Sequence, residues 1–151
     1  MSVDKAAYSE LLLSLTSRLS RMCGKVLEKP LEKQGVSLQE FRITGLLIGE
    51  QGINQKTLAE MLFVKPATLS VAINKLERKG FIQRTVSETD KRVNYLSLCE
   101  GVDFSETNAL LFAVERQMHQ GISQGDIETT RNTLNKMISN LESGAGINQS
   151  V

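Results

Sequence analysis

The chain has 151 residues, a formal net charge of +1, and a composition that is 40% hydrophobic and 23% charged. This length fits one domain with a buried core, and the near-neutral charge does not by itself indicate a partner. The apolar run Leu11–Leu13 is too short for a secretory signal or a membrane span, which predicts a cytoplasmic protein with no membrane partner. Cys23 and Cys99 have no CxxC partner, so no metal, cofactor or disulfide framework is expected.

The first predicted element is a long helix from Lys5 to about Lys33. Pro30 is expected to end or bend this helix. Gly35 is expected to end any helical turns that continue beyond Pro30. The helix prediction depends on apolar residues at steps of three and four, namely Leu11, Leu15, Leu19, Met22 and Val26.

Three further helices are predicted before the helical periodicity of the sequence changes to the pattern of β-strands. Ser37 and Glu40 have the spacing of a capping box before a helix that ends near residues 49–52. Asn54 is expected to cap a third helix over residues 55–62. Lys65 and Pro66 open a fourth, because proline suits a first helical turn. Its buried stripe is expected to be Leu69, Ile73 and Leu76, with Gly80 as its stop.

A β-hairpin and two helices are predicted to complete the chain. Residues 81–86 and 93–98 have strand character, and the polar segment 87–90 is suited to a turn between them. Helical periodicity returns after Gly101, with a start near residues 103–105. Gly125 and Asp126 are expected to cap a last helix, and residues 144–151 to form a frayed tail.

This order of elements predicts a mainly α (α+β) fold, a winged helix-turn-helix with long terminal helices. The terminal helices carry more apolar surface than one small lobe needs, which predicts that they form a dimerisation region. The alternative is a helical domain with an incidental hairpin. The expected division is an N-terminal dimerisation helix in residues 1–36, a DNA-binding lobe in 37–100, C-terminal dimerisation helices in 101–143 and a flexible tail in 144–151. The residues expected to hold the dimer together are Leu11, Leu15, Leu134, Ile138 and Leu141.

Positive charge is concentrated between residues 63 and 92, which hold seven basic and three acidic residues, a net +4 against +1 for the chain. The cluster coincides with the fourth helix and the hairpin, the two elements that a winged helix presents to double-stranded DNA. The alternative is that this charge cluster is an ordinary solvent-exposed surface. The expected DNA contacts are Lys65, Pro66, Ala67, Thr68, Ser70, Val71, Asn74, Lys75, Arg84, Asp90, Lys91 and Arg92.

The hairpin offers a specific arrangement of charges. Arg84 is expected to lie near Asp90 across the hairpin, so that the carboxylate braces the tip. Arg92 would then be free to enter a narrow minor groove. The alternative is an ordinary surface ion pair of Arg84 with Asp90.

Several segments resemble the MarR family of regulators: residues 37–42, residues 54–62, the Leu76–Ile82 junction, and the wing from Asp90 to Leu98. The resemblance implies a triangular homodimer on a pseudo-palindromic operator, and control by a small-molecule effector, often phenolic or amphipathic, bound between the dimer region and the DNA lobe. It makes a ligand-responsive repressor the expected function. Val71 stands where many members have an arginine, and Cys99 where many have a threonine. Because valine offers only methyl groups, an A·T-rich half-site is expected.

Three other functions are alternatives to a ligand-responsive repressor. An enzyme is not expected, because the single histidine, His119, has no nucleophile or metal-ligand set beside it in the sequence. A thiol-based redox regulator of the same fold is the main alternative, since Cys23 lies close to Arg21 and Lys25, which would favour a thiolate. A winged helix that docks a protein is less consistent with a basic wing tip at Arg92.

Overall fold

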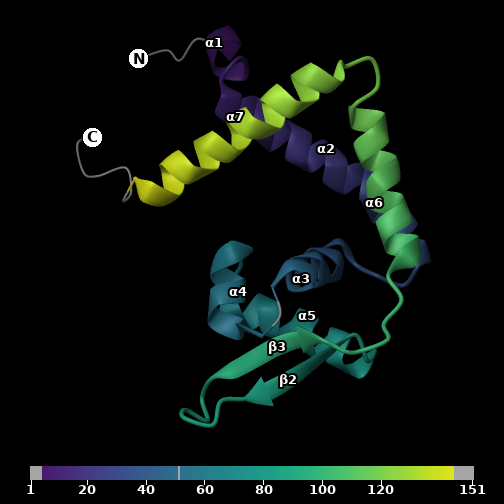
Figure 1. The fold of residues 1–151 in the computed structure, drawn as a ribbon, viewed down its shortest axis with the longest axis vertical. Helices are drawn as coiled ribbons and strands as arrows, with labels where there is room; N and C mark the ends of the chain where they lie inside the picture. Colours follow the sequence, from purple (N-terminus) through teal and green to yellow (C-terminus); the bar gives the residue numbers. More distant parts are fainter. Residues whose placement is uncertain (1–4, 51, 145–151) are drawn as a thin grey trace. The chain divides into compact units, whose positions relative to one another are not determined.

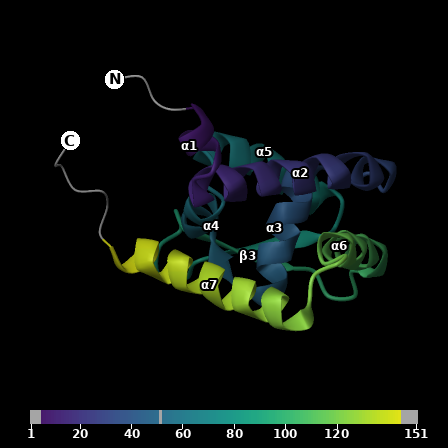
Figure 2. The ribbon, with the colours of Figure 1, turned by 90° about the horizontal axis from the view of Figure 1, so that it is seen from above.

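A computed structural model describes residues 5–50 and 52–144, and it confirms the mainly helical fold with a small antiparallel sheet (Figures 1 and 2). The chain separates into two compact units, one up to Leu111 and one from Phe112 onward. The elements in chain order are α1 (Lys5–Ser9), α2 (Leu12–Lys33), α3 (Leu38–Gly49), β1 (Ile53–Asn54), α4 (Gln55–Met61), α5 (Pro66–Arg78), β2 (Ile82–Val86), β3 (Asn94–Leu98), α6 (Ser105–Met118) and α7 (Gln124–Ser143).

The first unit packs α3, α4 and α5 against a three-stranded antiparallel sheet in the order β1–β3–β2. The hairpin of β2 and β3 projects beyond these helices (Figure 1). Ile82 pairs with Leu98 and Val86 with Asn94, while the short strand β1 places Ile53 opposite Leu96. All three helices and all three strands contribute to one buried core, formed by Ile43, Leu47, Ile53, Leu58, Ala59, Leu69, Ala72, Ile73, Leu76, Ile82 and Leu96.

The predicted helix starts are confirmed where a local side chain caps them. Ser37 Oγ accepts a hydrogen bond from the Glu40 N–H at 3.1 Å, and Glu40 Oε2 accepts one from the Ser37 N–H at 2.8 Å. Asn54 Oδ1 accepts from the Thr57 N–H at 2.8 Å, and Pro66 occupies the first turn of α5. These contacts satisfy N–H groups that have no partner within a helix.

The structure corrects the prediction for the N-terminal segment. The predicted single helix is divided into α1 and α2 at Leu11, whose backbone is extended. The apolar spacing continues through this break, so periodicity alone did not reveal it. Pro30 does not end α2, which runs on to Lys33 before Gly35 reverses the chain with a φ of 71°.

Two further differences concern α7 and the sheet. The cap of α7 is Ser123 and not the predicted Gly125–Asp126 pair, because Ser123 Oγ accepts from the Asp126 N–H at 3.1 Å and donates to its carboxylate at 2.7 Å. Strand β1 was not predicted, since two residues are too short to show an alternating pattern. Residues 145–151 of the predicted tail lie outside the described residues.

An ion pair between a buried carboxylate and an exposed lysine joins the start of α3 to the end of α5. Glu40 is only 3% exposed, and the Lys79 Nζ lies 2.9 Å from its Oε2. Lys79 also donates to the Gly35 carbonyl at 2.7 Å. Burial raises the pKa of Glu40, but hydrogen bonds from Ser37 and Lys79 and the positive charge of Lys79 outweigh burial, so the pKa of Glu40 lies below its ordinary value of 4.5.

This pair predicts a pH-dependent stability. Because folding lowers the pKa of Glu40, the ionised carboxylate stabilises the fold fully above about pH 5, and the stabilisation is lost as the pH falls through the lowered pKa. Glu40→Gln should lower the free energy of unfolding by about 1–3 kcal/mol at pH 7 and flatten its decline toward pH 4. Urea titrations between pH 7 and pH 4 measure both effects. Glu60→Gln, at an exposed position, is the matched control. If the free energy of unfolding depends on pH equally in the two variants, the assignment of the pH dependence to Glu40 is wrong.

Candidate nucleic-acid interface

Helix α5 has one buried face and one exposed face. Leu69, Ala72, Ile73 and Leu76 are directed into the core because they recur at helical spacing. The outward face begins at the cap residue and includes an apolar position, Val71, that is 58% exposed. The exposed predicted contacts on this helix and its cap are Lys65, Pro66, Ala67, Thr68, Val71, Asn74 and Lys75.

Two predicted contacts on α5 have partners within the lobe. Ser70 is half-buried, and its Oγ accepts a hydrogen bond from Gln55 Nε2 at 2.8 Å. The Asn74 Oδ1 accepts a hydrogen bond from Arg84 Nη2. The first bond joins α5 to α4 and the second joins α5 to β2, so both side chains hold α5 in place relative to its neighbours.

The predicted pairing of Arg84 with Asp90 is wrong. Arg84 lies in the middle of β2, opposite Leu96, and not at the tip of the hairpin. Its guanidinium is directed to α5, where Nε lies 3.4 Å from the Glu77 Oε2. Six residues of sequence separation suggested proximity, but the strand register places Asp90 in the turn beyond the end of β2.

Asp90 instead holds the turn by contacts with the main chain. Its Oδ1 accepts from the Arg92 N–H at 3.0 Å, and its carbonyl accepts from the Val93 N–H at 2.9 Å. Ser87, which sequence reasoning did not select, accepts from the Asp90 N–H at 3.3 Å. These bonds fix the backbone of the tip, while the side chains of Lys91 and Arg92 are exposed.

The basic residues of this region differ in whether an acidic side chain of the lobe already neutralises their charge. Lys79 and Arg84 have carboxylate partners within the lobe, so their charge is partly neutralised. Across residues 5–50 and 52–144, no ion pair is found for the other five basic residues of the cluster, which are Lys65, Lys75, Arg78, Lys91 and Arg92. The charge available to a polyanion therefore comes from α5 and the wing tip.

A shallow groove brings one more cation beside the wing. It has a volume of about 360 Å³ and lies between the start of α4 and the end of the wing turn. Its wall includes Lys56, which was not among the predicted contacts, together with Arg92. The signal that could have selected Lys56 is its position in the first turn of the first helix of the helix-turn-helix.

Comparison with known proteins identifies the family of this chain. The model of the MarR family matches residues 36–93. The HTH-type transcriptional regulator SarZ of Staphylococcus haemolyticus is 31% identical over 113 residues, which cover 73% of this chain and 75% of that protein. The chain belongs to the MarR family.

Solved structures show the MarR fold over nearly the whole chain. A MarR-family regulator from Silicibacter pomeroyi superposes with a TM-score of 0.79 at 23% identity, covering 97% of this chain and 100% of that one. The Staphylococcus aureus MepR–DNA complex gives a TM-score of 0.70 at 24% identity, covering 85% and 97%. The second of these is a structure with DNA bound.

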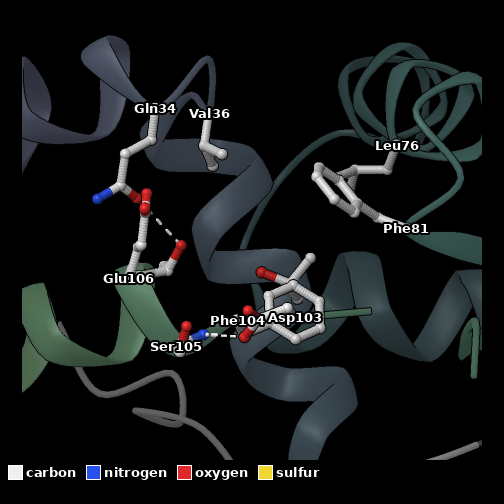
Figure 3. A pocket seen from close by; sticks show the side chains of 10 residues that line it. Gln34, Val36, Leu76, Phe81, Asp103, Phe104, Ser105 and Glu106 are labelled. Carbon is white, nitrogen blue, oxygen red and sulfur yellow. Dashed lines mark hydrogen bonds between the residues drawn. The ribbon is translucent and has the colours of Figure 1, made fainter. Parts of the chain in front are cut away.

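A small cavity lies beside the C-terminal end of α5 in this MarR-family chain (Figure 3). Its volume is about 190 Å³. Phe81 and Phe104 lie on its wall with ring centroids 6.0 Å apart, and Thr107 Oγ1 donates to Gln34 Oε1 at 3.1 Å. The Ser105 N–H donates to Asp103 at 2.8 Å and lowers the pKa of that carboxyl. The cavity combines an aromatic wall with a few polar groups.

The predicted dimer residues lie near the two ends of the chain, and Leu11 is in the break between α1 and α2. Leu11 and Leu15 are exposed in the first unit, and Leu134, Ile138 and Leu141 are exposed in the second. Cys23 and Cys99 are both half-buried, and no disulfide joins them. Within the described ranges, no helix is long and apolar enough to cross a membrane.

Proposed function

We propose that this MarR-family protein is a sequence-specific DNA-binding transcription regulator that binds a pseudo-palindromic operator as a homodimer. The observation that carries the proposal is the outward face of α5, which is flanked on α5 and the wing by five cations that form no ion pair with any described residue. A chain with a net charge of only +1 that concentrates positive charge on these two elements has the electrostatic footprint of a DNA-binding lobe.

Each part of the surface has a distinct role in the proposed complex. The first turns of α5 enter the major groove, where Thr68 and Val71 contact base edges and thymine methyl groups. Lys65 and Lys75 neutralise phosphates beside the groove. Arg92 reaches the adjacent minor groove from a tip that Asp90 and Ser87 hold in shape.

The homodimer is supported by apolar surface that one chain leaves uncovered. In α2, large apolar side chains recur at helical spacing on an exposed stripe, and α7 carries a second stripe. We assign the dimer contacts to residues 1–36 and 101–143, and the DNA lobe to residues 37–100. The uncovered members of the two stripes are Leu12, Leu15, Leu19, Met22, Val26, Leu134, Ile138 and Leu141.

Selection from random duplex DNA, followed by binding titrations at several salt concentrations, tests this function. We expect an A·T-rich pseudo-palindrome with half-sites roughly 10 bp apart. Lys75→Ala should weaken binding to every sequence alike and reduce the salt slope by about one unit per half-site, because one phosphate contact is lost. Lys136→Ala, an exposed lysine of α7, is the control that should bind as wild type does. Failure of the wild-type protein to enrich any sequence would overturn the proposal.

We further propose that the protein is a repressor and that a small molecule controls its binding to DNA. A dimer on its operator excludes other proteins from the same DNA, which supports repression. The cavity beside Phe81 and Phe104 supports an effector of about one aromatic ring, because a cavity of roughly 150 Å³ is sufficient for benzene. A thermal-shift screen of phenols and other single-ring compounds, repeated with DNA release as the readout, tests it. A screen in which no compound both stabilises the protein and releases DNA would contradict this part.

A further inference from the structure

Phe63, in the turn between α4 and α5, is in an unfavourable position for a phenylalanine in two respects. Its side chain is 96% exposed, the highest value among the exposed large hydrophobic residues of the described chain. Its φ is +53°, and it is the only described residue other than glycine with a positive φ. Glycine would suit this position better, because it exposes no apolar ring to water and adopts a positive φ without strain.

The hydrogen bonds around Phe63 show why the backbone takes this conformation. The Phe63 N–H donates to the Glu60 carbonyl at 3.1 Å, and the Val64 N–H donates to the Ala59 carbonyl at 3.1 Å. This pair of bonds is the Schellman motif, in which glycine usually occupies the position that Phe63 holds. Leu62 and Val64 on either side pack against the core, whereas Phe63 does not. The ring therefore contributes little to the packing of the lobe.

The position of Phe63 relative to α5 limits what the ring can contact. Only two residues separate it from Pro66, so the two Cα atoms lie within about 11 Å of each other. Lys65, the cap of α5, is exposed in the same turn. When the first helix of a helix-turn-helix crosses the DNA backbone and the second enters the major groove, the turn between them lies at the edge of that groove.

We propose that Phe63 is a specificity-determining residue that packs its ring against a thymine methyl group at the edge of each half-site. Apolar contact between phenylalanine and the thymine C5-methyl is an established form of base readout. The inference rests on the proposed DNA-binding function and adds a contact outside α5 itself. It gives a function to an exposed ring at a position where the backbone favours glycine, because a residue strained by its surroundings is typical of a functional position.

Three variants separate this role from a structural one. Phe63→Gly removes the ring and relieves the backbone, Phe63→Asn tolerates the same backbone with a polar side chain, and Phe63→Tyr keeps the ring. Glycine and asparagine should leave the melting temperature equal to or above that of wild type. Binding to the duplex selected by the wild-type protein should weaken by about 15-fold for the dimer, or about fourfold per half-site. Tyrosine should bind within about twofold of wild type.

Replacing thymines of the selected duplex by deoxyuridine, one position at a time, locates the contact. Wild type should lose about fourfold in affinity per half-site at one position, and Phe63→Gly should not distinguish thymine from uracil there. A Phe63→Gly variant that binds as tightly as wild type overturns the inference while the proposed function stands. A lowered melting temperature or a loss of dimer in that variant assigns the ring to the fold or to a protein contact, and also overturns it. If wild type enriches no sequence, both proposals fail.

Discussion

Replacing Ile138 by glutamate is expected to convert the protein into a monomer that binds DNA at least 100-fold more weakly. Ile138 lies in the middle of the α7 stripe and is 54% exposed in the single chain. In a symmetric dimer the change occurs twice, and each copy would bury a carboxylate without a partner at a cost of about 3–5 kcal/mol. Since every 1.4 kcal/mol is tenfold, dissociation of the dimer should rise by more than about 1,000-fold.

Loss of DNA affinity follows from loss of the second lobe. Two linked half-site contacts bind about 10²–10⁴-fold more tightly than one. Light scattering at micromolar concentration measures the mass, and anisotropy with the selected duplex measures the affinity. Asn140→Glu is the matched control, because residue 140 is exposed and lies about 200° around α7 from Ile138. A dimeric Ile138→Glu variant, or a monomeric wild type, would show that this stripe does not hold the dimer.

Arg92→Ala is expected to weaken operator binding by about 10- to 100-fold per half-site, the range for loss of a good base or groove contact. The Arg92 N–H is held by Asp90, so the tip presents the side chain in one backbone arrangement. The guanidinium has no ion pair among the described residues and is available to a narrow, electronegative groove. Anisotropy titrations against the selected duplex at two salt concentrations measure the effect.

Changes at the two neighbouring positions, 90 and 91, serve as controls for Arg92. Lys91→Ala removes the same charge from the adjacent exposed position and should reduce mainly the salt dependence. Asp90→Asn keeps an oxygen that accepts the Arg92 N–H and should bind nearly as wild type does, whereas Asp90→Ala should lose affinity as the turn loosens. If Arg92→Ala binds no more weakly than Lys91→Ala, the wing does not read the minor groove.

Features that depend on neighbouring residues were predictable from the sequence. Ser37 with Glu40, and Asn54 before α4, identify helix starts because capping acts within one turn. Leu69, Ile73 and Leu76 identify the buried face of α5 because burial follows the helical period. The winged helix-turn-helix itself was predicted from the order and spacing of such local signals.

Features that depend on distant residues were not predictable in the same way. The partners of Arg84 are on α5 and depend on the packing of β2 against that helix, which the sequence alone does not specify. The partner of Lys79 is separated from it by 39 residues. The backbone of Phe63 is set by the way α4 ends, against the preference of the residue itself.

The contact between Arg84 and α5 limits how a new DNA specificity could arise by substitution. Asn74 and Glu77 lie on the helix proposed to read the bases, yet both also hold a guanidinium whose Nε is buried. A change at either position leaves that cation without one of its partners, a cost that does not arise at Thr68 or Val71. Variants with altered operators should therefore accumulate changes first at positions 68 and 71, and changes at position 74 should occur together with a change at position 84.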